Sequence, residues 1–361
     1  MTEIFLTIFF ITVLLFFLGS GIWVALSMIG VSAIGMMLFT SRPVGDAMAT
    51  TIWGTSSSWT LTALPLFVWM GEILFRTKLS ENLFRGLSPW MQRLPGGLIH
   101  VNVVGCALFA AISGSSAATV ATVGKMSIPE LRKRNYPEKI LLGSLAGSGT
   151  LGLLIPPSII LIIYGVAVQE SIAKLFIAGI LPGIMIALIF MSYVIIWSLL
   201  NKKQMPSITE DYSLVEKIKK SKQLLPVILL IFAVIGSIYT GIATATEAAS
   251  LGVIGALILS YFQKSLSLDT FKSSLLGATK TSCMIAFILA GSTFLSLAMG
   301  FTGLPRNLAI WIQDMNLSPY VLIFVLMIFY IILGMFLDGI SAVVLTMAII
   351  EPMIRQAGFD M

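Results

Sequence analysis

Charged residues are scarce in this chain of 361 residues, since Asp, Glu, Lys and Arg make up only 11% of it. Soluble domains carry charge on about a quarter of their residues, so a soluble globular fold is excluded. Apolar residues make up 57% of the chain, the mean hydropathy is +1.00, and apolar runs recur from residue 4 to residue 350. Continuous apolar runs at 4–18 and 320–337 disfavour a transmembrane β-barrel, whose strands alternate. The sequence predicts an all-α polytopic membrane protein.

Cysteine and histidine are almost absent, which removes several kinds of chemistry. Cys106 and Cys283 lie in apolar stretches and are interpreted as packing residues, so neither a disulfide framework nor a thiolate metal site is expected. His100 is the only histidine, and no Gly-x-Ser-x-Gly motif accompanies it, so a metal cluster and a Ser-His hydrolase are both unsupported.

No nucleotide-binding loop is complete, because the pattern ending at Gly124-Lys125 fails at Thr119 and Met126. Uphill transport must then draw on an ion gradient or on another subunit. The net charge of +6 is typical of cytoplasmic loops in a polytopic protein rather than of nucleic-acid binding. The N-terminal apolar run lacks a basic start and a cleavage site, so it is interpreted as a retained helix instead of a signal peptide.

Apolar runs predict membrane helices at residues 4–18, 21–39, 57–75, 139–168, 172–200, 225–243, 248–263, 281–300 and 319–337. Residues 98–129 are also apolar, but a small and polar centre leaves each arm too short to cross the membrane. This pattern is typical of a re-entrant helical hairpin with its tip at 113–116, where the backbone must face protein or a polar cavity. A second hairpin is predicted with its turn at 338–341.

The polar linker at 201–224 determines the predicted topology, because its lysines assign it to the cytoplasm. With the linker inside, the first helix begins outside. The basic clusters at 76–93 and 125–139 then also fall on the cytoplasmic side.

Two halves of opposite orientation are predicted from the distribution of charge. A shift of 225 residues superposes the two predicted tips, with Gly114 on Gly339. Residues 76–93 and 125–136 hold eight Lys and Arg, whereas their shifted partners hold only two. This asymmetry indicates the inverted-repeat architecture of secondary transporters.

The predicted domains follow from that repeat. They are a first repeat at 1–200, with the hairpin 98–129 and a broken helix 139–168, the linker 201–224, and a second repeat at 225–361. The second repeat stops where the first still has residues 137–200 to go. Either the chain is truncated before a second broken helix or the second repeat is naturally shorter, and truncation is the favoured interpretation.

The first predicted tip offers hydroxyl and backbone groups to a ligand. Its candidate binding residues are Ser113, Gly114, Ser115, Ser116 and Thr119. Amides that open a short helix attract an anionic group, and carbonyl and hydroxyl oxygens can ligate a dehydrated Na⁺. Alternatively, these small residues simply allow helices to pack closely in lipid.

Pro156 and Pro157 form a second candidate site with Ser158. Two successive prolines remove two amide donors, so they must break the helix and free carbonyls near mid-membrane that can ligate a cation. The alternative is a kink whose free carbonyls are satisfied by neighbouring helices.

Three acidic residues could contribute to an ion path. Asp338 lies in an apolar stretch beside Gly339 and Ser341 at the second tip. It is either part of an ion path or a cap of the following helix. Glu247 is either a site residue or a helix-start acid, and Glu72 is interpreted as an interfacial partner of Arg76.

Six short motifs occur in order along the chain, namely His100–Val104, Ile112–Ser116, Leu154–Ser158, Ile177–Gly183, Thr246–Ala249 and Gly334–Gly339. Together they resemble the large membrane (M) subunit of the tripartite ATP-independent periplasmic (TRAP) transporters, the DctM-like family. The chain departs from that family at Thr119, where many members have an acidic residue, and at Ala245, where proline is common.

The resemblance implies an elevator-type carrier, in which a transport domain with two hairpins and two broken helices moves against a scaffold. It implies Na⁺-coupled import of a small organic acid, such as a C4-dicarboxylate, sialic acid or a 2-oxo acid, delivered by a periplasmic binding protein. A small membrane subunit would brace the scaffold in the bacterial inner membrane. The candidate Na⁺ ligands are Ser113, Ser116 and Asp338.

Two other functions remain open at this stage. A passive channel could use the same repeats, and an intramembrane hydrolase could use Ser115 or Ser116. A carrier needs the binding protein and an inward Na⁺ gradient, whereas a channel conducts without either. No catalytic residue, no cofactor besides Na⁺ as coupling ion and no nucleic-acid partner are expected.

Overall fold

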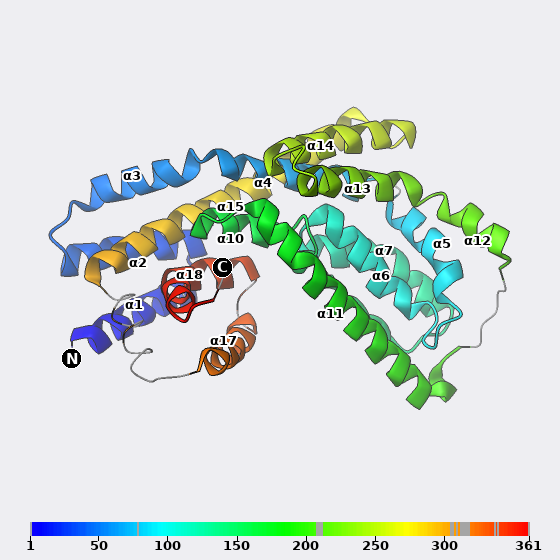
Figure 1. Ribbon diagram of the computed structural model, residues 1–361, viewed down its shortest axis with the longest axis horizontal. Helices are drawn as coiled ribbons and strands as arrows, with labels where there is room; N and C mark the ends of the chain where they lie inside the picture. The colour runs from blue at the N-terminus through cyan, green and yellow to red at the C-terminus, as the bar shows by residue number, and fades with distance from the viewer. Residues whose placement is uncertain are drawn as a thin grey trace. The chain divides into compact units, whose positions relative to one another are not determined.

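The computed structural model describes residues 2–77, 79–206, 212–303, 307, 310, 318–335, 337 and 339–359, and in these ranges its regular structure is entirely helical (Figure 1). Four described helical spans are long and apolar enough to cross a membrane, at Glu138–Val168, Ile172–Leu200, Ala245–Phe262 and Leu268–Thr302. The number rises to seven if each of three bent helix pairs counts as one span. These spans agree with the predicted all-α polytopic class.

The chain divides into two compact units. The first, called here the hairpin unit, comprises Thr62–Ile162 and Ser171–Thr281. Its helices are α4 (Ala63–Phe75), α5 (Leu79–Met91), α6 (Ile99–Ser113), α7 (Ser116–Lys133), α8 (Glu138–Gly149), α9 (Leu151–Leu154), the start of α10 (Ile159–Val168), α11 (Ile172–Leu200), α12 (Leu214–Ser221), α13 (Leu225–Tyr239), α14 (Ala245–Phe262) and the first part of α15 (Leu268–Thr302).

The second, called here the terminal unit, comprises Met1–Leu61, Ile163–Glu170 and Ser282–Met361. Its helices are α1 (Thr2–Gly19), α2 (Val24–Phe39), α3 (Val44–Ser56), the remainder of α10 and of α15, α17 (Pro319–Gly334) and α18 (Gly339–Gln356). A cluster of Met36, Phe294 and Ala298 forms part of its core. The hydroxyl of Ser292 donates to the Val344 carbonyl at 2.6 Å, which connects α15 to α18.

In the hairpin unit, α4 packs closely against α14 because Gly252 on α14 leaves room for the Met70 side chain on α4. A Cβ on Gly252 would lie 2.5 Å from the sulfur of Met70, so only glycine leaves room for that methionine. Close approach at small residues is how apolar helices associate when no water drives them together. The ring of Phe67 packs edge-on against Phe176 at 6.0 Å, which adds α11 to the same core.

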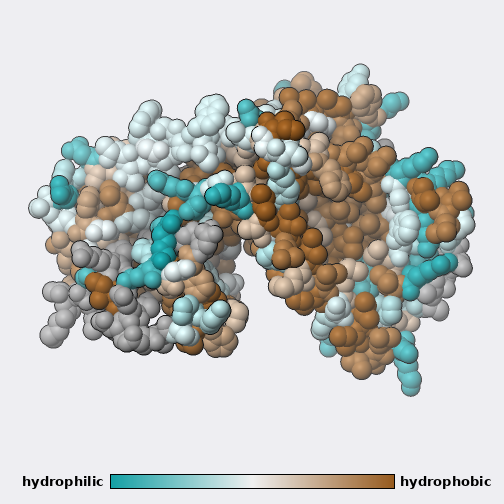
Figure 2. Space-filling model, viewed as in Figure 1, coloured by the Kyte–Doolittle hydropathy of each residue, from teal (hydrophilic) through white to brown (hydrophobic). Residues whose placement is uncertain are grey.

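Large apolar side chains cover the outer surface of the hairpin unit on α11, α13 and α14 (Figure 2). Leu181 is 77% exposed, Phe232 71% and Ile254 55%. Exposed apolar surface of this extent marks contact with lipid or with another protein.

Several helices differ from those that the sequence predicts. Helices α3, α5 and α12 lie where no helix is predicted, the segment 57–75 begins as a 3₁₀ turn at Trp59–Thr62, and the segment 281–300 is part of the longer α15. In α5 the buried residues Leu83, Phe84 and Leu87 recur at helical spacing. A short amphipathic helix of this kind is not detected by a search for membrane-length apolar runs.

Two of the acidic residues, Glu247 and Glu72, make the contacts expected of a structural role. The Thr244 amide donates to the Glu247 carboxylate at 2.8 Å, and the Glu247 amide donates to the Thr244 hydroxyl, so Glu247 belongs to a capping box that starts α14. Glu72 forms an ion pair with Arg76 one turn later on α4. The interpretation of both cysteines as packing residues is correct for the buried Cys106 and wrong for Cys283, which is exposed.

Candidate functional site

Helices α6 and α7 form a hairpin whose turn consists of Gly114 and Ser115. Gly114 has a φ of 58°, in the left-handed region that glycine adopts without a Cβ penalty. Ser115 is the N-cap of α7, and its hydroxyl accepts a hydrogen bond from the Ala118 amide at 3.5 Å. The turn therefore lies inside the predicted tip at 113–116.

A hydrogen-bond network holds the polar side chains of this tip together. The hydroxyls of Ser113 and Thr119 lie 2.9 Å apart, and both side chains are buried. The Ser115 carbonyl accepts the Thr119 amide at 3.0 Å, the Thr119 hydroxyl at 2.7 Å and the Ser113 hydroxyl at 3.3 Å. Ser116 makes no side-chain hydrogen bond to any described residue, so its hydroxyl is available to a ligand.

The Pro156–Pro157 pair separates α9 from α10, and the peptide bond between the two prolines is cis. Neither proline has an amide hydrogen, so the carbonyls one turn earlier lose their helical partners. One of these, the Leu153 carbonyl, instead accepts the hydroxyl of the buried Ser158. The predicted break is thus present, and Ser158 provides a hydrogen bond to one of the carbonyls that the break frees.

The hairpin tip and the proline break lie directly against each other. The Ile159 amide donates to the Gly114 carbonyl at 3.4 Å. A Cβ on Gly114 would lie 2.9 Å from the Pro157 carbonyl oxygen, and a Cβ on Gly152 would lie 2.8 Å from the Ser115 carbonyl oxygen. Two glycines therefore permit an approach of backbone to backbone on both sides of the tip.

Four helix ends converge at this junction of the hairpin unit, namely the C-termini of α6 and α9 and the N-termini of α7 and α10. Free amides give a helix N-terminus a partial positive charge, and free carbonyls give a C-terminus a partial negative charge. The junction therefore offers complementary groups to an anion and to a cation within one small volume.

Any cation held here would be ligated by oxygen. The junction supplies hydroxyl and carbonyl oxygens, which suit a hard cation such as Na⁺ better than a transition metal. The described residues contain no group of three or more His, Cys, Asp or Glu side chains that could hold a metal. Since the Ser115 carbonyl already accepts several donors and the Leu153 carbonyl accepts the Ser158 hydroxyl, the available ligands are the hydroxyls of Ser113 and Ser116 and the carbonyl freed by Pro156.

The second predicted half-site is described only in part. Asp338 lies outside the described residues, Gly339 is the first residue of α18, and Ser341 is buried in the same helix. Gly339 and Ser341 belong to the terminal unit, whereas the first tip and the proline break belong to the hairpin unit.

Asn102 is a residue to which the sequence assigns no role beyond its place in a motif. It is fully buried on α6, and its amide nitrogen donates to the Leu141 carbonyl at 3.2 Å and to the Ser144 hydroxyl at 3.0 Å on α8. The available signal is the polar side chain itself, because an amide at this depth in an apolar helix needs a partner.

Replacing Asn102 by alanine should lower the melting temperature of the purified protein, with an expected loss of about 1–3 kcal/mol for a buried hydrogen-bonding group. The control is Asn201→Ala, because the Asn201 amide donates to the Trp197 carbonyl at the end of α11, where water can replace it. Thermal unfolding of both variants measures the difference. Equal losses in the two would contradict a link between α6 and α8.

Discontinuous helices that meet inside an apolar helical bundle are typical of membrane transport proteins. Over residues 9–361 the chain matches the family described as the tripartite ATP-independent periplasmic transporter, DctM component. The chain therefore belongs to the DctM family of TRAP transporter large permeases.

Individual relatives agree with this assignment. The chain is 32% identical over 329 residues to the C4-dicarboxylate TRAP transporter large permease protein DctM of Pseudomonas aeruginosa, an alignment that covers 91% of this chain and 76% of that protein. It is 30% identical over 346 residues to the sialic acid TRAP transporter large permease protein SiaM of Vibrio cholerae, covering 95% and 80%. It is 29% identical over 348 residues to the isethionate TRAP transporter permease protein DctMQ of Oleidesulfovibrio alaskensis, covering 95% and 54%.

Proposed function

We propose that this chain is the large permease subunit of a Na⁺-coupled importer of a small organic anion. The observation that carries the proposal is the junction at which the hairpin tip meets the proline break. A site that joins partial positive and partial negative helix ends can bind an anion and its coupling cation together. Coupling then follows because each ion reduces the electrostatic cost of placing the other in a site away from water.

The Na⁺ site that we propose uses the hydroxyls of Ser113 and Ser116. Ser113 can keep its proton in the hydrogen bond to Thr119 or to the Ser115 carbonyl while its oxygen lone pair faces the cation. The free amides that open α7 and α10 would receive the acidic group of the substrate.

The substrate class that we propose is a small carboxylate, such as a C4-dicarboxylate, sialic acid or a 2-oxo acid. Support comes from the printed names of two relatives, which specify C4-dicarboxylate and sialic acid. The name of the DctMQ relative specifies isethionate, so an acidic group other than carboxylate also occurs in the family. The features shared by these substrates are small size and an anionic group.

The partners that we propose are a small membrane subunit and a periplasmic substrate-binding protein, in the inner membrane of a bacterial cell. The name of the TRAP family supports the periplasmic component. The DctMQ relative, of which this chain covers 54%, supports a second membrane component fused to the first. The exposed apolar surface on α11, α13 and α14 provides area for lipid and for such a subunit.

The transport mechanism that we propose is an elevator, in which a transport domain moves against a scaffold and the chain consists of two inverted repeats. In its support, α17 and α18 repeat the helix–turn–helix pattern of α6 and α7 about 225 residues later in the chain. The reversed distribution of basic residues between the halves supports opposite orientations in the membrane.

Uptake by proteoliposomes that contain the assembled transporter tests this function. Uptake of a radiolabelled organic acid should require both the cognate binding protein outside and an inward Na⁺ gradient. Uptake that runs down the substrate gradient without either would favour a passive channel and overturn the proposal. A panel of organic acids assayed first on the binding protein would identify the substrate to use.

The double variant Ser113→Ala/Ser116→Ala should raise the Na⁺ concentration for half-maximal uptake by about tenfold or more, a factor that corresponds to about 1.4 kcal/mol. The matched control is Ser127→Ala on the same helix, because the buried Ser127 hydroxyl has no partner among the described residues and lies three turns from the tip. Sodium titrations of uptake compare the two. An unchanged Na⁺ dependence in the double variant would count against the ligand assignment.

A further inference from the structure

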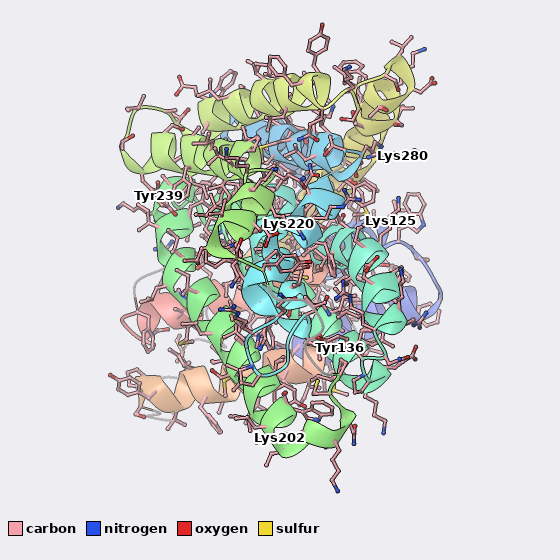
Figure 3. The ribbon with its side chains drawn as sticks, turned by 90° about the vertical axis from the view of Figure 1, so that its right-hand side faces the viewer. Lys125, Tyr136, Lys202, Lys220, Tyr239 and Lys280 are labelled. Carbon is pink, nitrogen blue, oxygen red and sulfur yellow. The ribbon has the colours of Figure 1, made fainter. Side chains whose placement is uncertain are left out.

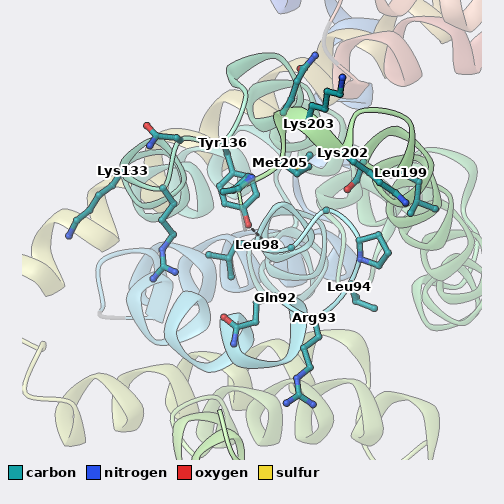
Figure 4. Close-up of a pocket in the computed structure, with 18 residues that line it drawn as sticks. Gln92, Arg93, Leu94, Leu98, Lys133, Tyr136, Leu199, Lys202, Lys203 and Met205 are labelled. Atoms are coloured by element: carbon teal, nitrogen blue, oxygen red, sulfur yellow. Dashed lines mark hydrogen bonds between the residues drawn. The ribbon is translucent and has the colours of Figure 1, made fainter. Parts of the chain in front are cut away.

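A hollow lies in the hairpin unit, away from the junction, at the opposite ends of α6 and α7. It has a volume of about 1030 Å³ and is lined by residues from three segments, 92–98 before α6, 133–136 at the end of α7 and 198–206 at the end of α11 (Figure 4). Figure 3 shows Lys202 at the far end of α11, near Tyr136. The proposed function gives this hollow no role.

Basic residues surround this pocket. Its 18 lining residues include five basic ones and no acidic one. The basic residues are Arg93, Lys133, Arg134, Lys202 and Lys203. Arg134 lies 4.0 Å from Glu130, whose carboxylate partly neutralises the positive charge of Arg134. The three lysines are exposed around the opening and come from two different segments. Such a concentration of one charge attracts anions.

Tyr136 and the loop before α6 pack together at the floor of the pocket. The Tyr136 hydroxyl accepts the Leu98 amide at 3.1 Å, and a Cβ on Gly97 would lie 2.4 Å from that hydroxyl, so the loop before α6 is held tightly against Tyr136. Burial raises the pKa of Tyr136, outweighing the opposing effects of the Leu98 hydrogen bond and of Arg134, so its phenol stays neutral at physiological pH. Tyr136 also packs on the buried cluster of Ile99, Ile140 and Val194.

The pocket opens beside an apolar surface that belongs to the last turns of α11. Leu199 lines the pocket, and Ile196 and Leu200 nearby are 58% and 79% exposed. By the positive-inside rule, the basic residues favour the cytoplasmic leaflet for this end of the unit. An anion bound here therefore has lipid-exposed hydrocarbon beside it, as the headgroup of a phospholipid requires and a free phosphate does not.

We propose that this pocket binds the phosphate headgroup of an anionic phospholipid from the cytoplasmic leaflet, with Lys133, Lys202 and Lys203 as the principal charged contacts and the end of α11 against the acyl chains. Basic pockets between helix ends at the cytoplasmic surface are suited to multiply charged headgroups. Because Lys133 is the last residue of the hairpin helix α7 and Lys202 and Lys203 follow α11, a bound headgroup would bridge these elements.

Native mass spectrometry of the assembled transporter with cardiolipin and with phosphatidylcholine of the same acyl chains tests this site. The wild type should retain cardiolipin preferentially. The pocket variant Lys133→Gln/Lys202→Gln/Lys203→Gln should lose about a hundredfold in cardiolipin affinity, since each lysine near a membrane surface contributes about fivefold. The control Lys219→Gln/Lys222→Gln/Lys272→Gln removes the same charge from exposed positions outside the pocket and should lose less than about fivefold.

Wild-type protein gives a second measurement that does not depend on the folding of a variant. A cardiolipin analogue with a photoactivatable headgroup should label peptides that contain residues 92–98, 133–136 or 198–206. Labelling only elsewhere overturns the proposal, as does equal cardiolipin affinity of the pocket variant and the wild type, or an equal loss in the control. Occupation by glycerol 3-phosphate without any selectivity for cardiolipin would assign the pocket to a soluble anion and overturn the lipid assignment.

Discussion

Replacing Gly114 by alanine is expected to reduce uptake by at least about thirtyfold and to lower the melting temperature. A Cβ at this position would lie 2.9 Å from the Pro157 carbonyl oxygen and 3.0 Å from the Ile159 nitrogen, and both are backbone atoms that cannot turn aside. Overpacking of this kind costs about 1–3 kcal/mol. A left-handed φ adds about 1 kcal/mol for a residue other than glycine. The helix ends of the junction would have to separate.

The control for this variant is Gly241→Ala. Gly241 has a φ of 71°, also left-handed, but a Cβ there would meet nothing within 4 Å. This control carries the backbone strain without the collision, so it should lose some thermal stability and keep its uptake. If both variants transport equally well, the contact between the tip and the proline break is not required for transport.

Replacing Gly152 by alanine is expected to disturb the polar network at the tip and to raise the half-saturating Na⁺ concentration by about tenfold or more. The new Cβ would lie 2.8 Å from the Ser115 carbonyl oxygen and 2.9 Å from the Thr119 hydroxyl. Relieving these contacts must move the residues that orient Ser113. Sodium titrations of uptake in proteoliposomes, combined with thermal unfolding, would measure both effects.

A matched glycine lies nearby on α8. Gly143 has nothing within 4 Å of a built Cβ, so Gly143→Ala should leave Na⁺ dependence unchanged and stabilise the helix by up to about 1 kcal/mol. Identical Na⁺ dependence in the Gly152 variant and in the wild type would show that the network does not control the cation.

The turn of the hairpin and the break at the prolines could be predicted from sequence because both are set by local residues. Glycine and serine at 113–116 end one helix and cap the next, and Pro156 and Pro157 remove amide donors wherever they lie. The class of membrane protein could be predicted as well, since composition and the length of apolar runs determine it.

The contact between these two interruptions could not be predicted, because it depends on packing between segments about 40 residues apart. Neither Gly152 nor Asn102 carries a local signal of its partner, although a glycine and an asparagine in apolar helices each suggest a special position. The basic pocket could not be predicted for the same reason, because its lysines lie at the end of α7 and just after α11, which only the folded chain brings together.

Asn102 joins α6 to α8 near one end of the hairpin, and the hydrogen bond between Gly114 and Ile159 joins the hairpin tip to the start of α10 at the other end. Because the hairpin is attached at both ends to the segment that contains the proline break, it should neither slide along that segment nor separate from it. Any movement that carries substrate across the bilayer should therefore move the hairpin and the broken helix together. Substrate release should then come from their joint movement against other parts of the protein rather than from their separation.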